Sequence, residues 1–327
     1  MNQWICLFAA LLLAACASDN QPKCQLPAGV KPFPKCHTNP AKHEWCATSG
    51  VRLPYMLALP GGKSRGVVIL VPGWDSVTGD YAPITRDLVR HGYAVYGSEN
   101  RTFAYGPPNL QGTARDWHPW VEDVKAFSRF VQARHPGVPV FWHGHSFGAV
   151  EVLQAAAEAA GGDTPAGIIV HSPGFALMPE RKNFLRGVLY GSVVWATFPQ
   201  VSQAEKKNLL PTTDCLWNCR WLHSDDRLRQ GYKVRFLITS ADMGILARHT
   251  SRTLRLPVLA MRGGKDRLAI NGVDSQRSAY DGYMTHELAG GRAEQFYREE
   301  GGHMLTEGST QQEALRAITR WLDTHTR

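Results

Sequence analysis

A serine between two glycines is the first candidate for chemistry in this 327-residue chain. Gly144-His145-Ser146-Phe147-Gly148 matches G-x-S-x-G, a pattern that holds a serine hydroxyl on a sharp turn where it can attack an acyl carbon. An apolar run predicts a strand over residues 138–143, directly before the pattern, and an Ala-rich run predicts a helix over 149–160. The flanking glycines remove side chains that would clash in the turn. We therefore predict that Ser146 is a nucleophile for acyl transfer.

A serine nucleophile needs a base to take its proton and an acid to orient that base. In the strand–turn–helix arrangement these residues follow in the order serine, acid, histidine. His303 lies in a Gly-containing loop between the last predicted strand and the last predicted helix, and Asp266 follows the strand predicted at 258–262. We predict that Asp266 and His303 complete a catalytic triad with Ser146. Reserve candidates for the acid are Asp242 and Asp274.

An acyl-transfer site also needs two backbone N–H groups for the oxyanion. We predict that Phe147, directly after the nucleophile, supplies one and that Trp74, after the first buried strand, supplies the other. His145 is held beside Ser146 by the turn, so its side chain is expected to point elsewhere. His143 and His171 fall at strand ends and are interpreted as structural.

The elements that must position these residues alternate between strand and helix. Strands are predicted at 66–71, 92–96, 138–143, 167–171, 258–262 and 295–298, with helices at 82–91, 117–134, 149–160 and 311–324. Residues 43–59 suggest a hairpin before them. This alternation predicts an α/β fold with a mostly parallel sheet covered by helices on both faces. The predicted division is a signal peptide (1–15), a tether (16–47), a core (48–175 and 256–327) and a helical cap inserted at 176–255.

Taken together, several segments resemble one known branch of enzymes. The segments similar to the monoacylglycerol lipase and lysophospholipase branch of the α/β-hydrolases, which is of the serine aminopeptidase type, are Gly73-Trp74, Gly79-Asp80-Tyr81, 91–95, 139–148, 257–266 and Gly302-His303. The resemblance covers roughly residues 48–327. It implies the α/β-hydrolase fold, and a serine hydrolase that cleaves lipid-type carboxylic esters through an acyl-enzyme, without metal or cofactor.

Two departures from that branch adjoin the expected acyl pocket. The branch usually has His-Gly where this chain has Pro72-Gly73, and Asp-x-Arg-Gly-x-Gly where it has residues 99–104. Neither departure removes a triad member. Because both adjoin the acyl pocket, the resemblance predicts the mechanism of this chain but not its substrate. The apolar cap segment 183–198 either lines an acyl pocket or packs the cap onto the core.

Two alternative functions stay open. A peptidase or amidase of the same fold would use the same triad on a different bond. A peptidase would need an acidic cluster in the cap to bind the amino terminus of a peptide, and the local candidate is Ser224-Asp225-Asp226. A surface binding protein that kept the fold without catalysis is the other alternative, against which the intact triad argues.

The first residues predict export. Residues 5–15 are apolar but too short for a permanent span, and they end in Leu13-Ala14-Ala15-Cys16, which resembles the lipobox of bacterial lipoproteins. The resemblance implies lipidation of Cys16, and Ala17 after it favours the outer membrane of a Gram-negative bacterium, facing the periplasm or the cell surface. The region before the apolar run lacks Lys and Arg, and cleavage near Ala15 would instead release a free secreted protein.

Export to an oxidising compartment makes disulfides possible. The spacing favours the pairs Cys24–Cys36 and Cys215–Cys219 and leaves Cys46 free on an early strand. Cys215 and Cys219 could also bind zinc, but two further ligands at suitable spacing are lacking, and we predict no metal site.

The net charge of +8 is spread along the chain. Diffuse positive charge favours anionic surfaces such as phospholipid head groups, although it also simply promotes solubility. Basic stripes with interleaved aromatic residues are absent from the sequence, so nucleic acid is not an expected partner. The expected partners are an acyl-ester small molecule or lipid and a membrane reached through the lipid anchor.

Overall fold

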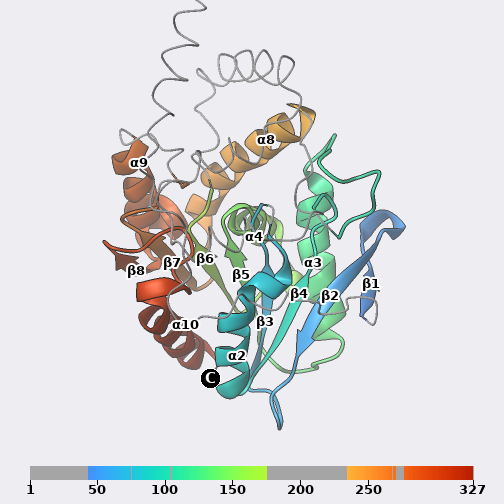
Figure 1. Cartoon of the computed structure of the whole chain (residues 1–327), viewed down its shortest axis with the longest axis horizontal. Helices are drawn as coiled ribbons and strands as arrows, with labels where there is room; N and C mark the ends of the chain where they lie inside the picture. Colours follow the sequence, from blue (N-terminus) through green and yellow to red (C-terminus); the bar gives the residue numbers. More distant parts are fainter. Residues whose placement is uncertain are drawn as a thin grey trace, which may run out of the picture.

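The computed structural model describes residues 43–74, 76–103, 105–174, 234–266, 268–269 and 276–326 (Figure 1). The strands are β1 (Glu44–Cys46), β2 (Arg52–Ala58), β3 (Gly66–Val71), β4 (Tyr93–Ser98), β5 (Val140–His145), β6 (Gly167–His171), β7 (Val258–Gly263) and β8 (Glu294–Arg298). The helices are α2 (Ala82–Arg90), α3 (His118–Gln132), α4 (Phe147–Glu158), α8 (Val234–Thr250), α9 (Arg277–Gly282) and α10 (Gln311–His325).

The described strands form one eight-stranded sheet in the order β1-β2-β4-β3-β5-β6-β7-β8. β1 and β2 pair antiparallel as the predicted hairpin, β2 pairs antiparallel with β4, and every pairing from β4 to β8 is parallel. Parallel strands bring their carboxyl ends to one edge, where open α/β sheets bind ligands. Ser146, which follows β5, lies at that edge.

Alternate residues of the central strands separate two apolar layers. In β3, Val67, Ile69 and Val71 belong to one buried cluster, and Val68 and Leu70 belong to the other. This is the period of two expected of a strand buried on both faces. The first cluster is covered by α3, α4 and α8, and the second by α2 and α10, which lie side by side (Figure 1). The predicted sheet with helices on both faces is confirmed.

Two predicted boundaries differ around Ser146. The strand runs over Val140–His145, two residues later than predicted at each end. It starts later because Pro139 has no N–H to contribute to the ladder, and it ends later because His145 still pairs with His171 of β6. The helix begins at Phe147 rather than 149, because a single residue makes the turn. The strand and the helix therefore meet at Ser146 with no loop between them.

The region predicted as a cap is described only from residue 234. There α8 packs against α4, and Phe236, Met243 and Ala247 join the same apolar cluster as α3. Residues 176–233, including 183–198 and Ser224-Asp225-Asp226, lie outside the described residues, and the cap stays a prediction. Among the described residues no helix is long and apolar enough to cross a membrane.

Candidate active site

Ser146 is held in a conformation that non-glycine residues rarely adopt. Its φ is 55° and its ψ is −117°, between the end of β5 and the first residue of α4. Such a conformation costs energy and persists where the surrounding structure enforces it. Here the Ser146 N–H donates to the His171 carbonyl at 2.9 Å, and the Ser146 carbonyl accepts from Ala149 N–H at 3.1 Å. The turn is thus pinned to β6 on one side and α4 on the other.

The two glycines of the pentapeptide are sterically required. A Cβ on Gly144 would lie 2.4 Å from the Gly148 carbonyl oxygen, and one on Gly148 would lie 2.2 Å from the Val71 carbonyl oxygen. No side chain fits at these distances without a backbone shift. Gly144 therefore allows the first turn of α4 to fold back on β5, and Gly148 allows α4 to approach the end of β3.

His303 and Asp266 form a buried pair. The His303 Nδ1 lies 3.0 Å from each carboxylate oxygen of Asp266, and the two residues are 2% and 0% exposed. Burial alone would raise the pKa of the Asp266 carboxyl, but the charge and hydrogen bond of His303 outweigh it and hold that pKa below its ordinary value. Asp266 is therefore an anion that accepts the Nδ1 proton of His303, which leaves Nε2 as the ring nitrogen turned away from the carboxylate.

The loops that carry this pair are packed backbone to backbone. A Cβ on Gly263 would lie 2.2 Å from the Gly301 carbonyl oxygen, so only glycine allows the end of β7 to approach the His303 loop this closely. The Lys265 N–H donates to that same carbonyl at 2.9 Å. Arg277 donates to the Asp266 carbonyl at 2.5 Å. Asp266 and His303 are thus placed together by contacts between residues far apart in sequence.

The loop after β3 lies against the serine. A Cβ on Gly73 would come within 3.0 Å of the Ser146 Cβ, which places the predicted oxyanion segment, including Trp74, beside the nucleophile. Phe147 is the first residue of α4, whose unpaired N-terminal N–H groups and positive dipole end favour a developing negative charge. Both predicted donors are therefore next to Ser146 in the chain or in space.

A hydrogen-bonded chain connects this loop to the histidine loop, and it includes Tyr81, which belongs to a segment of the resemblance but for which the sequence predicted no role. The Gly73 N–H donates to the Tyr81 hydroxyl at 2.9 Å, and the hydroxyl lies 2.9 Å from His145 Nδ1. The His145 Nε2 lies 3.1 Å from the His303 carbonyl. Since a carbonyl can only accept, the proton of His145 is on Nε2, and Nδ1 accepts from Tyr81. The side chain of His145 points away from the turn, as expected, and its function is to tie two loops together.

The histidines beneath the site are neutral. Burial, followed by the charge of His303, holds the pKa of His145 well below its ordinary value, and burial lowers that of His143 to about 3. His171 accepts the Leu305 N–H through Nε2 at 3.0 Å. The rings of His143 and His171 stack with centroids 5.6 Å apart. These contacts agree with the structural interpretation of both residues.

An aromatic cluster packs beside the nucleophile. The Phe147 ring lies with its centroid 6.2 Å from that of Trp74, 5.8 Å from Phe103 and 5.1 Å from Trp120. Phe236 of α8 lies 4.9 Å from Trp74. Phe103 comes from the segment 99–104 that departs from the resembled branch. These rings form an apolar wall behind Phe147.

The same departing segment carries a buried ion pair. Arg101 contacts Asp123 of α3 at 2.6 Å and donates to the Thr48 hydroxyl, also at 2.6 Å. Glu99 accepts the Thr78 hydroxyl at 2.6 Å, and burial raises the pKa of this carboxyl to about 7. The segment thus joins the hairpin, α3 and the loop after β3.

Other predicted residues fall away from this site or outside the described residues. Asp242 is exposed on α8, so it does not share the buried setting of Asp266. Cys46 is a free, exposed cysteine on β1. In the part of the chain that the structure describes, no cluster of side chains is suited to hold a metal ion. The predicted residues that lie outside it are Cys16, Cys24, Cys36, Cys215, Cys219 and Asp274.

Comparison with known proteins places the chain among hydrolases. Residues 62–304 match the family Hydrolase_4, described as serine aminopeptidase, S33. The human monoglyceride lipase is 26% identical over 236 residues, which is 70% of this chain and 72% of that protein.

Solved structures show the same architecture. A monoacylglycerol lipase from Paleococcus ferrophilus superposes with a TM-score of 0.63 at 22% identity, covering 83% of this chain and 99% of the other. A soluble variant of monoglyceride lipase from Saccharomyces cerevisiae gives 0.69 at 17% identity, covering 91% and 99%. At these identities the likeness establishes the fold, which is the α/β-hydrolase fold.

Proposed function

Because the chain belongs to the Hydrolase_4 family of serine aminopeptidase S33 type and is an ester hydrolase, we propose that it cleaves lipid-type carboxylic esters with Ser146 as its nucleophile. The observation that carries this proposal is a strained, buried serine next in the chain to His145, whose ring centroid lies 4.7 Å from that of His303 in the buried His303–Asp266 pair. Strain of this kind clusters at active sites, because it is retained where function uses the geometry.

The reaction proceeds in two halves. Ser146 Oγ forms a bond to the acyl carbon while its proton passes to His303 Nε2, and the N–H groups of Trp74 and Phe147 stabilise the oxyanion. The bond to the leaving oxygen then breaks, and His303 returns its proton to that oxygen. In the second half, water gives a proton to His303 while its oxygen bonds to the acyl carbon. The bond from that carbon to Ser146 Oγ then breaks, and His303 returns the proton to Oγ, which releases the carboxylic acid and restores Ser146. Asp266 stabilises the imidazolium in both halves.

Two observations support a lipid-type substrate. Trp74 is partly exposed beside the nucleophile, and it packs on the rings of Phe147 and Phe236 in a buried aromatic cluster that also holds Phe103 and Trp120. The similar human protein is a monoglyceride lipase. The proposed substrate is therefore a monoacylglycerol or a lysophospholipid-like ester.

The test combines three variants with a chain-length series of aryl esters. We expect Ser146→Ala to lower kcat by roughly 10⁶-fold, as for other serine hydrolases. We expect Asp266→Asn to lower it by about 10⁴-fold, because an amide favours the wrong tautomer of His303. The matched control is Asp242→Asn, which changes an exposed acid on α8 and should keep wild-type activity. Retained activity in Ser146→Ala would refute the assignment.

The family description also names an aminopeptidase, so the same enzymes should be assayed on aminoacyl amides. We expect the ester kcat/KM to exceed the amide value and to rise with acyl length. A preference for the amide would show that the chain is a peptidase instead. Failure of Ser146 to react with a fluorophosphonate probe would indicate a binding protein without catalysis.

We also propose that the protein is exported and anchored in the outer membrane through a lipid on Cys16. The support is the apolar segment ending in Leu13-Ala14-Ala15-Cys16. In cells, Cys16→Ser should remove incorporation of labelled palmitate and release the protein from the membrane fraction. Palmitate labelling that persists in this variant would overturn the proposal.

A further inference from the structure

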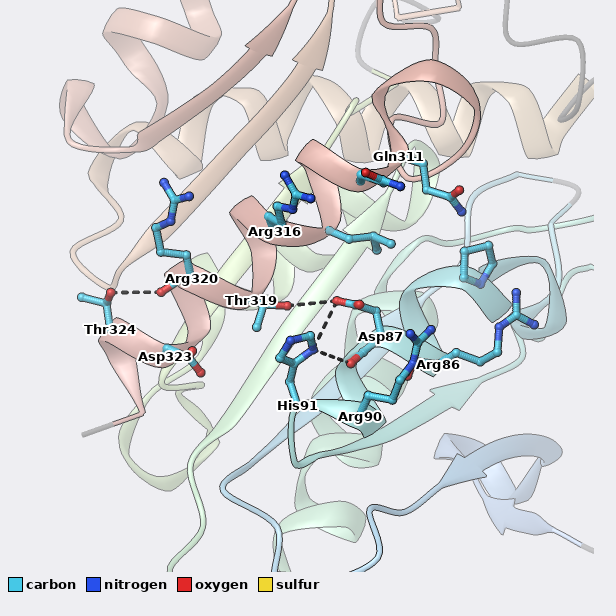
Figure 2. Close-up of a pocket in the computed structure, with 13 residues that line it drawn as sticks. Arg86, Asp87, Arg90, His91, Gln311, Arg316, Thr319, Arg320, Asp323 and Thr324 are labelled. Carbon is cyan, nitrogen blue, oxygen red and sulfur yellow. Dashed lines mark hydrogen bonds and ion pairs between the residues drawn. The ribbon is translucent and has the colours of Figure 1, made fainter.

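A groove of about 1100 Å³ runs between α2 and α10, apart from the residues of the active site (Figure 2). Four arginines line it, two on each helix, at Arg86, Arg90, Arg316 and Arg320. All four are exposed. The groove combines the concave shape of a binding site with a concentration of one charge.

The arginines are arranged in the same way on both helices. On each helix the two arginines are four residues apart, so they share one helix face. All four arginines line the groove between the neighbouring helices α2 and α10, and the side chains of Arg316 and Arg320 extend on the side of α10 away from α2 (Figure 2). Like charges at this spacing destabilise a helix, so the arrangement does not serve helix stability.

The carboxylates that line the groove are already engaged. Asp87 accepts the Thr319 hydroxyl at 3.2 Å and lies 3.5 Å from His91 Nδ1. Asp323 pairs with Arg65 at 2.9 Å and accepts the Tyr93 hydroxyl at 2.7 Å.

The arginines themselves lack acidic partners. None of the four makes a salt bridge within the described ranges. Four arginines thus line one groove that holds two carboxylates, Asp87 and Asp323, and none of the four is paired with either of them. A bound anion would supply them with a counter-charge.

We propose that this groove binds the phosphate groups of anionic lipids at a membrane surface. Guanidinium groups pair with phosphate oxygens through two parallel hydrogen bonds, which favours a phosphate-bearing ligand. Several groups spread along a groove of this volume suit several head groups at a surface rather than one small ion. The choice of a lipid surface rests in addition on the proposed function, since a lipid-type ester is presented by a membrane.

The position of the groove fits that use. α2 begins one residue after Tyr81, in the loop system that contacts Ser146, and α10 begins eight residues after His303. Both helices therefore start near the catalytic edge of the sheet and lead away from it. A membrane bound along them would bring the catalytic edge close to the lipid without covering the triad.

Sedimentation with vesicles tests the proposal. The full chain would carry Cys16→Ser in every arm so that no lipid anchor contributes. Vesicles of equimolar phosphatidylglycerol and phosphatidylcholine would be compared with phosphatidylcholine alone. The groove variant combines Arg86→Gln, Arg90→Gln, Arg316→Gln and Arg320→Gln. The control combines Arg52→Gln, Arg115→Gln, Arg129→Gln and Arg134→Gln, which remove equal charge from exposed sites outside the groove.

Each arginine near an anionic surface is worth about a fivefold change in partitioning. We therefore expect the groove variant to bind anionic vesicles roughly 10²–10³-fold more weakly than the parent, and the control to lose much less. Equal losses would mean that diffuse net charge binds the lipid, and unchanged binding of the groove variant would mean that the groove does not. Displacement by inorganic phosphate at the same phosphate concentration would indicate a site for free phosphate. Each of these three results overturns the proposal.

A second readout separates this inference from the proposed function. None of the four arginines belongs to the triad or the oxyanion loop, so the groove variant should hydrolyse a soluble short-chain aryl ester at the wild-type rate. Wild-type hydrolysis also shows that the variant is folded. If the parent failed to hydrolyse the ester but still bound anionic vesicles through the groove, the proposed function would fail and this inference would stand.

Discussion

The hydroxyl of Tyr81 connects the loop beside Ser146 with the histidine beneath it, and Tyr81→Phe removes that single atom. Tyr81 is 2% exposed, and burial raises its pKa above the ordinary value, so the hydroxyl stays protonated at working pH. The variant keeps the ring and its packing but leaves the Gly73 N–H and His145 Nδ1 without their partner. Each buried polar group left unpaired costs about 1–3 kcal/mol. We therefore expect unfolding free energy to fall by about 2–6 kcal/mol.

The same change should impair catalysis through position alone. Without its anchor at Gly73, the loop carrying Trp74 can shift relative to Ser146, and a misplacement of about 1 Å costs up to 10²-fold in rate. We expect kcat on aryl esters to fall by about 10- to 100-fold with little change in KM, because the hydroxyl does not contact the substrate.

The matched control is Tyr93→Phe. The Tyr93 hydroxyl bonds Asp323 at 2.7 Å and Thr326 at 3.1 Å, away from Ser146. Its loss should cost about 1 kcal/mol and leave kcat unchanged. Urea denaturation and steady-state kinetics on both variants provide the comparison. The reasoning is refuted if Tyr81→Phe loses no more stability than Tyr93→Phe and keeps kcat within about twofold.

Two further predictions concern the buried histidine and the tight turn. Burial lowers the pKa of His143 to about 3, so below pH 6.5 the unfolded state binds a proton that the folded state does not, and stability falls as the pH decreases. Urea denaturation should show that the free energy of unfolding falls between pH 7 and pH 5 by about 2 kcal/mol more in the wild type than in His143→Leu. An equal fall in both proteins would contradict this. Gly148→Ala would place its Cβ 2.2 Å from the Val71 carbonyl oxygen, whereas Gly162 has no atom within 4 Å. Thermal unfolding should show a loss of about 3 kcal/mol for Gly148→Ala and under about 0.5 kcal/mol for Gly162→Ala, and similar melting temperatures would argue against the steric account.

The local pattern of the sequence determined most of the architecture. Apolar runs such as Gly66–Val71 predicted strands buried on both faces, and their alternation with helical segments predicted the parallel sheet that the structure has. The pattern also predicted Ser146 at a strand–helix junction, because G-x-S-x-G depends on steric limits within a few residues. Asp266 and His303 followed from the order serine, acid, histidine that accompanies this turn and from their places after strands.

Tertiary structure decided what depends on contacts between distant residues. The link from Gly73 through Tyr81 to His145 joins three segments, and the sequence predicted no role for Tyr81, because its hydrogen-bond partners are distant in the chain and leave no local pattern. The two arginines of α2 and the two arginines of α10 are more than two hundred residues apart in the sequence. They line one groove only because α2 and α10 pack on the same face of the sheet. Periodicity is a property of neighbouring residues, whereas a partner across the fold is set by how the layers pack. The sequence therefore predicted the elements and the nucleophile, and the packing decided what supports them.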